Sequence, residues 1–246
     1  MNIILFDETD YYQNKDTIRL SGYRFDHISE ILKSKKNDLL QVGLINGKLG
    51  TGKVIEITGQ YTDISVTLDK DPPLPASLTL LLALPRPKIL KRTLKHITVL
   101  GVKKIFLINS FRVDKSYWQT PVLDKEKIKD IFLNSLEQSC DTVLPELFMK
   151  PLFKPFVEDE LPDIIKNTIP VIAHPKAANT LVDISGKHFT LAVGPEGGFI
   201  PYEIKKLKEC GFEEYNFGER ILPVETAVPG IISILTRSIH SCVDVP

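Results

Sequence analysis

Two short glycine-containing loops are the part of the chain best suited to hold a small ligand. The first, residues 194–198, follows the apolar run 190–193, which is typical of a buried strand. Because Gly197 and Gly198 have no Cβ, the backbone of this loop can approach a ligand closely. Pro201, a residue suited to the first position of a helix, comes next. This order of strand, glycine loop and helix predicts a ligand site at the carboxyl end of a strand.

A second loop, residues 217–222, follows another predicted strand and precedes a helix predicted over residues 223–241. Arg220 and Glu225 flank the end of this loop, and two interpretations are open for them. They either form a surface salt bridge, worth only about 0 to 1 kcal/mol, or act on a bound substrate. Glu196 in the first loop is equally open, since its carboxylate either stabilises the N-terminus of the following helix or shapes the pocket.

Basic side chains gather between residues 86 and 115, a span in which Asp114 is the one acidic residue. Lysine and arginine on one face neutralise phosphates and supply affinity without sequence preference. An isolated run of this kind is more often a solvated helix face, so its role depends on what lies beside it. The basic residues considered for nucleic-acid contact are Arg86, Lys88, Arg92 and Arg112, with a smaller group at Lys33, Lys35 and Lys36.

The composition excludes several classes of function. Thirty-one lysines and arginines balance 31 aspartates and glutamates, so any RNA binding must come from local patches. No apolar run is long enough to span a membrane, and the N-terminus lacks a signal-like core. Cys140, Cys210 and Cys242 lack metal-site spacing and predict reduced thiols in a cytoplasmic protein without metal. His174 ends a predicted strand, where we favour a place in a ligand loop over a general-base role.

The chain divides into a β-rich first part and an α/β second part. Short strand candidates at residues 3–6, 38–45, 48–58 and 61–68, with a helix at 26–33 and an Asn46-Gly47 hairpin turn, predict a small barrel. Prolines between residues 71 and 75 break this pattern. We therefore predict domains 1–72 and 73–246.

The second domain alternates strands with helices, which is the signature of an α/β fold with a parallel sheet. Its predicted strands are residues 78–84, 104–108, 169–173 and 190–193, with one more before the second loop. Its predicted helices are residues 89–100, 124–139, 159–167, 201–210 and 223–241.

Taken jointly, the two loops resemble the RsmE family, the ribosomal RNA uridine-N3 methyltransferases of the SPOUT (trefoil-knot) superfamily. The matching motifs are V-G-P-E-G-G-F at residues 193–199 and G-E-R-I-L-P-V-E-T-A at residues 218–227, in matching order and spacing. Weaker resemblance covers nearly the whole chain. The resemblance implies a PUA-like β-barrel that binds RNA, then a knotted SPOUT methyltransferase domain, and a cytoplasmic homodimer formed through that second domain.

The resemblance also implies an activity: S-adenosyl-L-methionine-dependent methylation of N3 of a uridine in 16S ribosomal RNA of the small ribosomal subunit. Arg220 and Glu225 become the candidate catalytic residues, and the basic residues named above become candidate RNA contacts. The cofactor is expected to contact Ala173, His174, Val193, Gly194, Glu196, Gly197, Gly198, Phe217, Gly218, Ile221, Leu222 and Thr226.

The chain departs from the family pattern mainly on the substrate side. In the family motif K-A-T-E-L-G-V, here residues 96–102, His96 replaces the lysine and Val99 the glutamate. Asp141 and Val143 replace two usual arginines, and the family's R-T-E-T-A is P-V-E-T-A at residues 223–227. Two alternatives therefore stay open: a non-catalytic RNA-binding protein of the same fold, or a methyltransferase that acts on a different nucleotide.

Overall fold

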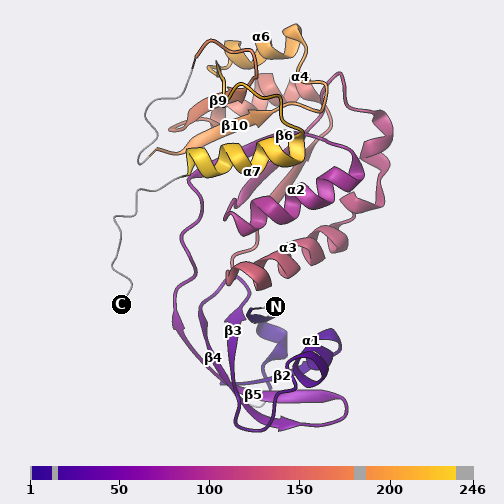
Figure 1. The fold of residues 1–246 in the computed structure, drawn as a ribbon, viewed down its shortest axis with the longest axis vertical. Helices are drawn as coiled ribbons and strands as arrows, with labels where there is room; N and C mark the ends of the chain where they lie inside the picture. Colours follow the sequence, from indigo (N-terminus) through magenta and orange to yellow (C-terminus); the bar gives the residue numbers. More distant parts are fainter. Residues whose placement is uncertain (1, 13–15, 180–186, 237–246) are drawn as a thin grey trace. The chain divides into compact units, whose positions relative to one another are not determined.

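The computed structural model describes residues 2–12, 16–179 and 187–236 of the 246-residue chain (Figure 1). The chain forms two compact units: the first comprises Met1–Leu74 and Phe132–Leu144, and the second comprises Pro75–Ile131 and Pro145–Pro246. Cys242 and residues 237–241 of the predicted closing helix lie outside the described residues.

A curled five-stranded sheet in the order β1-β3-β4-β5-β2 forms the first unit. Its strands are β1 (Ile4–Phe6), β2 (Thr17–Ser21), β3 (Leu39–Leu44), β4 (Leu49–Ile57) and β5 (Tyr61–Lys70). β1 runs parallel to β3, and the other neighbours are antiparallel. The predicted hairpin at Asn46-Gly47 is confirmed, since Asn46 has φ of 60° and the Gly47 amide donates to the Leu44 carbonyl at 2.8 Å.

The buried faces of these strands share one core that includes Phe6, Leu20 and Ile64. Sequence reasoning missed β2, whose short apolar pattern is interrupted by Arg19. The Arg19 guanidinium binds both carboxylate oxygens of Asp63 at 2.8 Å and lies between the rings of Tyr12 and Tyr61. Within the described residues no ladder joins the edge strands β1 and β2, so the strand pairing forms an open, mixed sheet.

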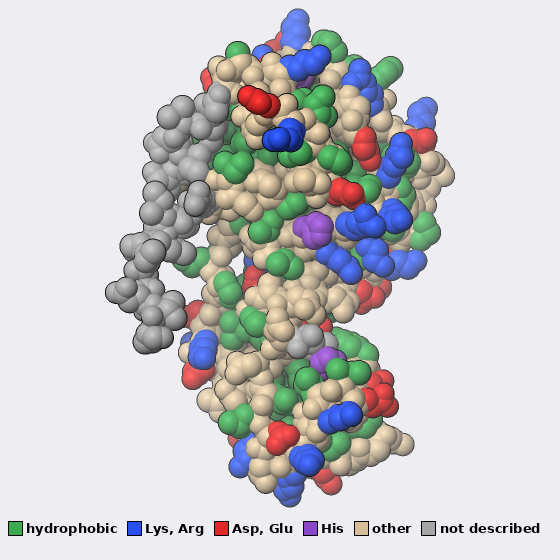
Figure 2. All heavy atoms as spheres, viewed as in Figure 1, with side chains coloured by type: hydrophobic (Ala, Val, Ile, Leu, Met, Phe, Trp, Pro, Cys, Tyr) green, Lys and Arg blue, Asp and Glu red, His purple; other side chains and the backbone are tan. Residues whose placement is uncertain are grey.

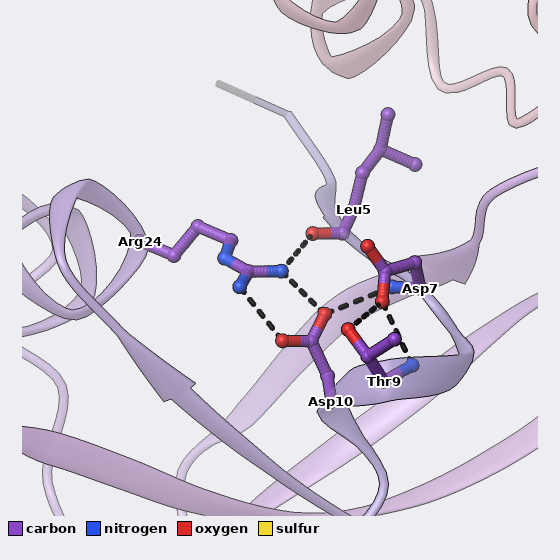
Figure 3. Close-up of polar contacts among 5 residues, drawn as sticks. All are labelled: Leu5, Asp7, Thr9, Asp10 and Arg24. Atoms are coloured by element: carbon purple, nitrogen blue, oxygen red, sulfur yellow. Dashed lines mark hydrogen bonds and ion pairs between the residues drawn. The ribbon is translucent and has the colours of Figure 1, made fainter.

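The predicted helix at residues 26–33 begins earlier, as α1 (Tyr23–Asp26), and continues as a π-helical turn, His27–Ile31. Arg24 fixes α1 to the N-terminal segment (Figure 3). Its guanidinium donates to both carboxylate oxygens of Asp10, at 2.5 and 2.7 Å, and to the Leu5 carbonyl at 3.4 Å. The Asp10 carboxylate also accepts from the Asp7 amide at 2.9 Å. The Asp10 side chain therefore contacts both α1 and the N-terminal segment.

The second half of α3 (Lys125–Ser139) belongs to the first unit. Leu136 is buried against Ile3 and Leu5. The Glu137 carbonyl accepts from the amides of Asn2, at 2.9 Å, and Ile3, at 3.3 Å. Residues 132–144 are therefore part of this unit's core, although they lie far from residues 1–74 in the chain.

The Glu137 carboxyl is buried, and its Oε1 has no hydrogen-bond partner among the described residues. Burial raises the pKa of Glu137 from 4.5 to about 7, although a backbone hydrogen bond from Leu5 opposes the shift. Because the folded state favours the neutral carboxyl, this group's contribution to stability is fully present below pH 4.5 and is lost as the pH rises to about 7.

We expect Glu137→Gln, which keeps the side chain neutral, to remove this pH dependence. The difference in Tm between variant and wild type should grow in favour of the variant from about pH 4.5 to about pH 7 and then level off. Differential scanning calorimetry of both proteins across this range measures it. A difference that stays constant with pH would contradict the assignment.

A six-stranded sheet, parallel throughout and ordered β11-β9-β10-β6-β7-β8, forms the second unit. Its strands are β6 (Leu78–Ala83), β7 (Lys104–Ile108), β8 (Glu146–Lys150), β9 (Ile169–Ala173), β10 (Phe189–Val193) and β11 (Glu213–Tyr215). The central strands β6 and β10 are buried throughout, as expected of continuous apolar runs covered on both faces. The alternating strands and helices of the predicted α/β fold are thus confirmed. The edge strand β8 was missed because it is only partly buried.

Besides the first half of α3, the α-helices of this unit are α2 (Pro87–Val99), α4 (Phe153–Pro155), α5 (Leu161–Ile164), α6 (Pro201–Glu209) and α7 (Val224–Leu235). α2 and α7 lie side by side in front of the sheet (Figure 1). The helix predicted over residues 159–167 is wrong in its bounds. The helical stretch begins at Phe153, passes through a π-helical turn at Phe156–Glu160 and ends at Ile164, and it buries Phe156, Val157 and Leu161.

Candidate functional site

The carboxyl ends of β9, β10 and β11 meet at one edge of the parallel sheet, and the segments that follow them line one cleft of about 710 Å³. Residues 173–176 follow β9, residues 193–199 follow β10, and residues 216–223 follow β11. β10 lies beside β6, where the strand order changes direction, which is the usual place for ligand sites in open α/β sheets. A volume of this size suits a small organic ligand.

The cleft is lined partly by apolar side chains and partly by the backbone of the glycine loop. The apolar side chains come from the second loop and from α7, and they are Phe217, Ile221, Leu222, Val224, Ala227, Ile231 and Ile234. The glycine loop comprises residues 194–198. The cleft can therefore hold a ligand that has a flat apolar part and a polar part. The sequence motifs alone did not indicate the α7 residues Ile231 and Ile234 as part of the cleft.

Close approaches explain the glycines of the first loop. A Cβ on Gly194 would lie 2.9 Å from the Phe199 amide nitrogen, and one on Gly197 would lie 2.8 Å from Cδ of Arg112. Gly198 has φ of 72°, and its amide donates to the Pro195 carbonyl at 2.7 Å. The loop therefore needs glycine for its own fold as well as for access by a ligand.

Two neighbouring loops hold the glycine loop in place. Nη1 of Arg112 donates to the Gly197 carbonyl, and the Arg86 amide donates to the Glu196 carboxylate at 3.3 Å. Glu196 also lines the cleft. These contacts favour a role for Glu196 in shaping the pocket over a role in stabilising the N-terminus of the following helix.

Glu203, which sequence reasoning missed, lies at the N-terminus of α6. This carboxylate is 2% exposed and accepts from the Ile200 amide at 2.9 Å, the Phe111 amide at 2.7 Å and the Ser110 hydroxyl at 3.1 Å. It joins the segment after β7 to the start of α6. A glutamate three residues into a helix was the available signal.

We expect Glu203→Ala to lower the free energy of unfolding by about 3 kcal/mol or more, because three donors lose their acceptor. Glu203→Gln, which keeps one acceptor oxygen, should have a smaller effect. Urea denaturation measures both. Glu209→Ala is the matched control on the same helix, since its carboxylate makes exposed ion pairs with Lys205 and Lys206. Equal effects at positions 203 and 209 would contradict the anchoring role.

The second loop is ordered by local contacts. Gly218 has φ of 136°, and its amide donates to Oδ1 of Asn216 at 2.9 Å. The His174 amide donates to the Tyr215 carbonyl at 3.0 Å, which joins the segments after β9 and β11. The His174 ring accepts from the Lys176 amide at 3.3 Å, and its Nδ1 lies 3.7 Å from Glu214. These contacts favour a loop-shaping role for His174.

The two predicted catalytic residues are in different surroundings. Arg220 is exposed and lines the cleft. Glu225 does not line it, and its carboxylate instead lies 3.4 Å from Nη1 of Arg92. The described part of the chain contains no ion pair between Arg220 and either Glu225 or Glu219. The interpretation of Arg220 as a salt-bridge partner of Glu225 is therefore wrong, because Glu225 pairs with α2.

Among the predicted cofactor residues, Thr226 is the one that does not line the cleft; it is exposed on the first turn of α7. The cleft contains the others: Ala173, His174, Val193, Gly194, Glu196, Gly197, Gly198, Phe217, Gly218, Ile221 and Leu222. Arg112, predicted as an RNA contact, lines it as well.

The exposed face of α2 is basic. Figure 2 shows blue side chains gathered over the region in which Figure 1 places α2. The residues are Lys88, Lys91, Arg92, Lys95 and His96, all exposed, with Arg86 just before the helix. Leu90, Leu94 and Ile97 form its buried face. Lys33, Lys35 and Lys36 belong to the first unit.

Asp141, which replaces a usual arginine of the family pattern, has a structural role in the first unit. It is 4% exposed, and its Oδ1 accepts from the Val143 amide at 2.9 Å. The Asp141 amide donates to the Leu136 carbonyl at 3.1 Å. The substitution thus places a carboxylate in the turn that ends α3.

The described residues contain no group of histidine, cysteine, aspartate and glutamate that could hold a metal ion. Nor do they contain a helix with the length and hydropathy needed to cross a membrane.

The known proteins that this chain resembles in sequence are RNA methyltransferases. The RNA methyltransferase domain family matches residues 72–236. The ribosomal RNA small subunit methyltransferase E of Treponema pallidum is 26% identical over 251 residues, which are 98% of this chain and 92% of that protein. The protein of the same name from Aquifex aeolicus is 30% identical over 149 residues, 60% of this chain and 62% of that protein.

Solved structures share the fold. The ribosomal RNA small subunit methyltransferase E of Neisseria gonorrhoeae, bound to S-adenosyl methionine, has a TM-score of 0.72 at 20% identity over 96% of each chain. A Legionella pneumophila protein in complex with bound cofactor SAM has a TM-score of 0.76 at 21% identity, over 95% of this chain and 96% of that chain.

Proposed function

The chain belongs to the RNA methyltransferase domain family, and from this premise we propose that it methylates N3 of a uridine in 16S ribosomal RNA with S-adenosylmethionine as the methyl donor. The observation that carries the proposal is the cleft at the carboxyl ends of β9, β10 and β11, where both sequence motifs meet. The membership in the RsmE family that these motifs indicated agrees with the names of the relatives.

The residues of the cleft suit this cofactor. The apolar side chains of α7 and the second loop offer a surface for the adenine ring of the cofactor. The backbone of the glycine loop offers polar groups to the remainder of the cofactor. Larger residues at Gly194 or Gly197 would clash with Phe199 or Arg112 and would disturb this loop. When bound, S-adenosylmethionine supplies a methyl group on a positively charged sulfur. The cleft residues would hold it for transfer to an attacking nitrogen, a reaction that needs an in-line approach at about 3 to 3.5 Å.

Arg220 supplies the electrostatic part of the reaction. N3 of uridine is a weak acid, and negative charge develops on the uracil oxygens as its proton leaves. An arginine that lines the cleft and has no carboxylate partner among the described residues can stabilise that charge. Glu225, held by Arg92, acts as a positioning residue for the first turn of α7 and not by touching the substrate.

The basic face of α2, with Arg86 and Arg112, binds the phosphates of the RNA. The finer structural expectations belong to the same proposal: a PUA-like barrel domain at residues 1–72 with Lys33, Lys35 and Lys36 as further RNA contacts, and a knotted methyltransferase domain at residues 73–246. We also propose a homodimer formed through the second domain and a place in the cytoplasm. The curled sheet of the first unit and the parallel sheet of the second support the two domains.

Two measurements test the function. Calorimetric titration should show that the purified protein binds S-adenosylmethionine. Mass spectrometry of 16S ribosomal RNA from cells with and without the gene should show one N3-methyluridine that depends on the gene. Cofactor binding without the modified uridine would point to another nucleotide. Absence of cofactor binding would leave the RNA-binding alternative.

A further inference from the structure

An exposed aromatic residue stands at the tip of the turn that follows β7. The Val113 amide donates to the Ser110 carbonyl at 3.0 Å, which closes a four-residue turn with Phe111 and Arg112 at its corners. Both ends of the turn are buried, with Ser110 3% and Val113 8% exposed, whereas Phe111 is 79% exposed. Turn corners usually hold glycine, proline, asparagine or aspartate, so the turn itself gives no reason for a phenylalanine.

The turn is fixed from several sides. Glu203 accepts from the Phe111 amide at 2.7 Å and from the Ser110 hydroxyl at 3.1 Å. Arg112 donates to the Gly197 carbonyl of the glycine loop. Just before the turn, Asn109 accepts from the Trp118 indole at 3.1 Å. The backbone of Phe111 is therefore held in place while its side chain stays largely exposed, which is the arrangement of a preorganised contact.

The surroundings of the ring define its partner. Single exposed apolar residues are common on protein surfaces and need no explanation by themselves. Phe111, however, is next to Arg112, which lines the cleft, and close in sequence to the exposed Lys115. The α2 face of the same unit is also basic. A partner that complements positive charge and also offers flat apolar surfaces is a nucleic acid with unpaired bases.

We propose that the Phe111 ring stacks on an unpaired base of the RNA substrate, beside the uridine that receives the methyl group. This inference rests on the proposed function and assigns a substrate-binding residue to it. A base presented for chemistry must leave its stack, which exposes the face of a neighbouring base. Aromatic side chains bind such faces without selecting a sequence, and loss of one such contact weakens binding by roughly 5- to 150-fold.

The test uses the full-length protein and small ribosomal subunits purified from cells that lack the gene. Phe111→Ala should raise KM for these subunits, and weaken their binding in a sedimentation assay, by about 5-fold or more. Phe111→Trp should retain both values, while Phe111→Leu should behave like alanine because it has no flat ring. Affinity for S-adenosylmethionine, measured by calorimetry, should stay unchanged in all three. Leu152→Ala, at a position 66% exposed after β8, is the control and should match wild type.

Three outcomes would overturn the inference. In the first, wild type methylates the subunits and Phe111→Ala has unchanged KM and binding, in which case the proposed function stands and the stacking fails. In the second, Phe111→Leu keeps the wild-type KM and binding although Phe111→Ala does not, which indicates a simple apolar contact and no stacking. In the third, Phe111→Ala changes the oligomeric state in analytical ultracentrifugation, which places the ring in a subunit interface. If wild type does not methylate, the proposed function fails, and the sedimentation assay still decides whether the ring binds RNA.

Discussion

Replacing Arg220 by alanine is expected to lower the methylation rate at saturating S-adenosylmethionine by about 10²- to 10³-fold, the usual effect of losing one donor to a developing oxyanion. Arg220 lines the cleft, and under the proposed function its charge should act on the substrate more strongly in the transition state than in the ground state. Cofactor affinity should change little, because the glycine loop offers mainly backbone groups. Single-turnover methylation of small subunits, with calorimetry on the same variant, measures both quantities.

Two further variants sharpen this prediction. Arg220→Lys should restore only part of the rate, since a point charge lacks the planar guanidinium. Lys166→Ala, which removes an exposed cation paired with Asp163, should leave the rate at the wild-type value. The opposing account gives Arg220 a purely structural role. It would be supported if Arg220→Ala lowered Tm and left the single-turnover rate intact.

The second large effect is expected at Gly197, where valine should weaken S-adenosylmethionine binding by about 10- to 100-fold. An added Cβ would lie 2.8 Å from Cδ of Arg112, so the Arg112 side chain or the glycine loop must shift, and both line the cleft. A loss of affinity of this size corresponds to about 1.4 to 2.8 kcal/mol of binding free energy. Calorimetric titration with the cofactor measures the affinity.

Gly59→Val is the matched control for this substitution. An added Cβ at Gly59 meets nothing within 4 Å, and Gly59 is not among the positive-φ glycines. Gly197→Val should reduce the free energy of unfolding by less than it weakens the free energy of cofactor binding, since residue 197 lies in a surface loop. Thermal unfolding of the same variant measures the first quantity. Equal affinity in wild type and Gly197→Val would refute the role of the glycine loop.

The sequence by itself was sufficient for the second unit's class and for most of the cleft. Continuous apolar runs such as β6 and β10 must be buried on both faces, and strands that alternate with helices form parallel sheets. Parallel strands bring their carboxyl ends to one edge, and the loops after β9, β10 and β11 meet there because the folded sheet makes these three strands neighbours. This explains why nearly all of the predicted cofactor residues line one cleft.

The partners of individual side chains depended on the tertiary structure. Arg220 and Glu225 are near neighbours in the chain. Because α7 packs against α2, however, Glu225 forms its ion pair with Arg92. Glu203 meets Ser110 and Phe111 across more than ninety positions of the chain, and no local pattern indicates such a pairing.

The same holds for the composition of the first unit. The periodicity of α3 predicts a helix with one buried face, but it carries no information about which core receives that face. Leu136 packs against Ile3 and Leu5, and the Glu137 carbonyl binds the amides that precede β1. Burial against a distant segment also raises the pKa of Glu137. Sequence patterns determine which surface a segment must bury, and only the assembled fold determines what lies against it.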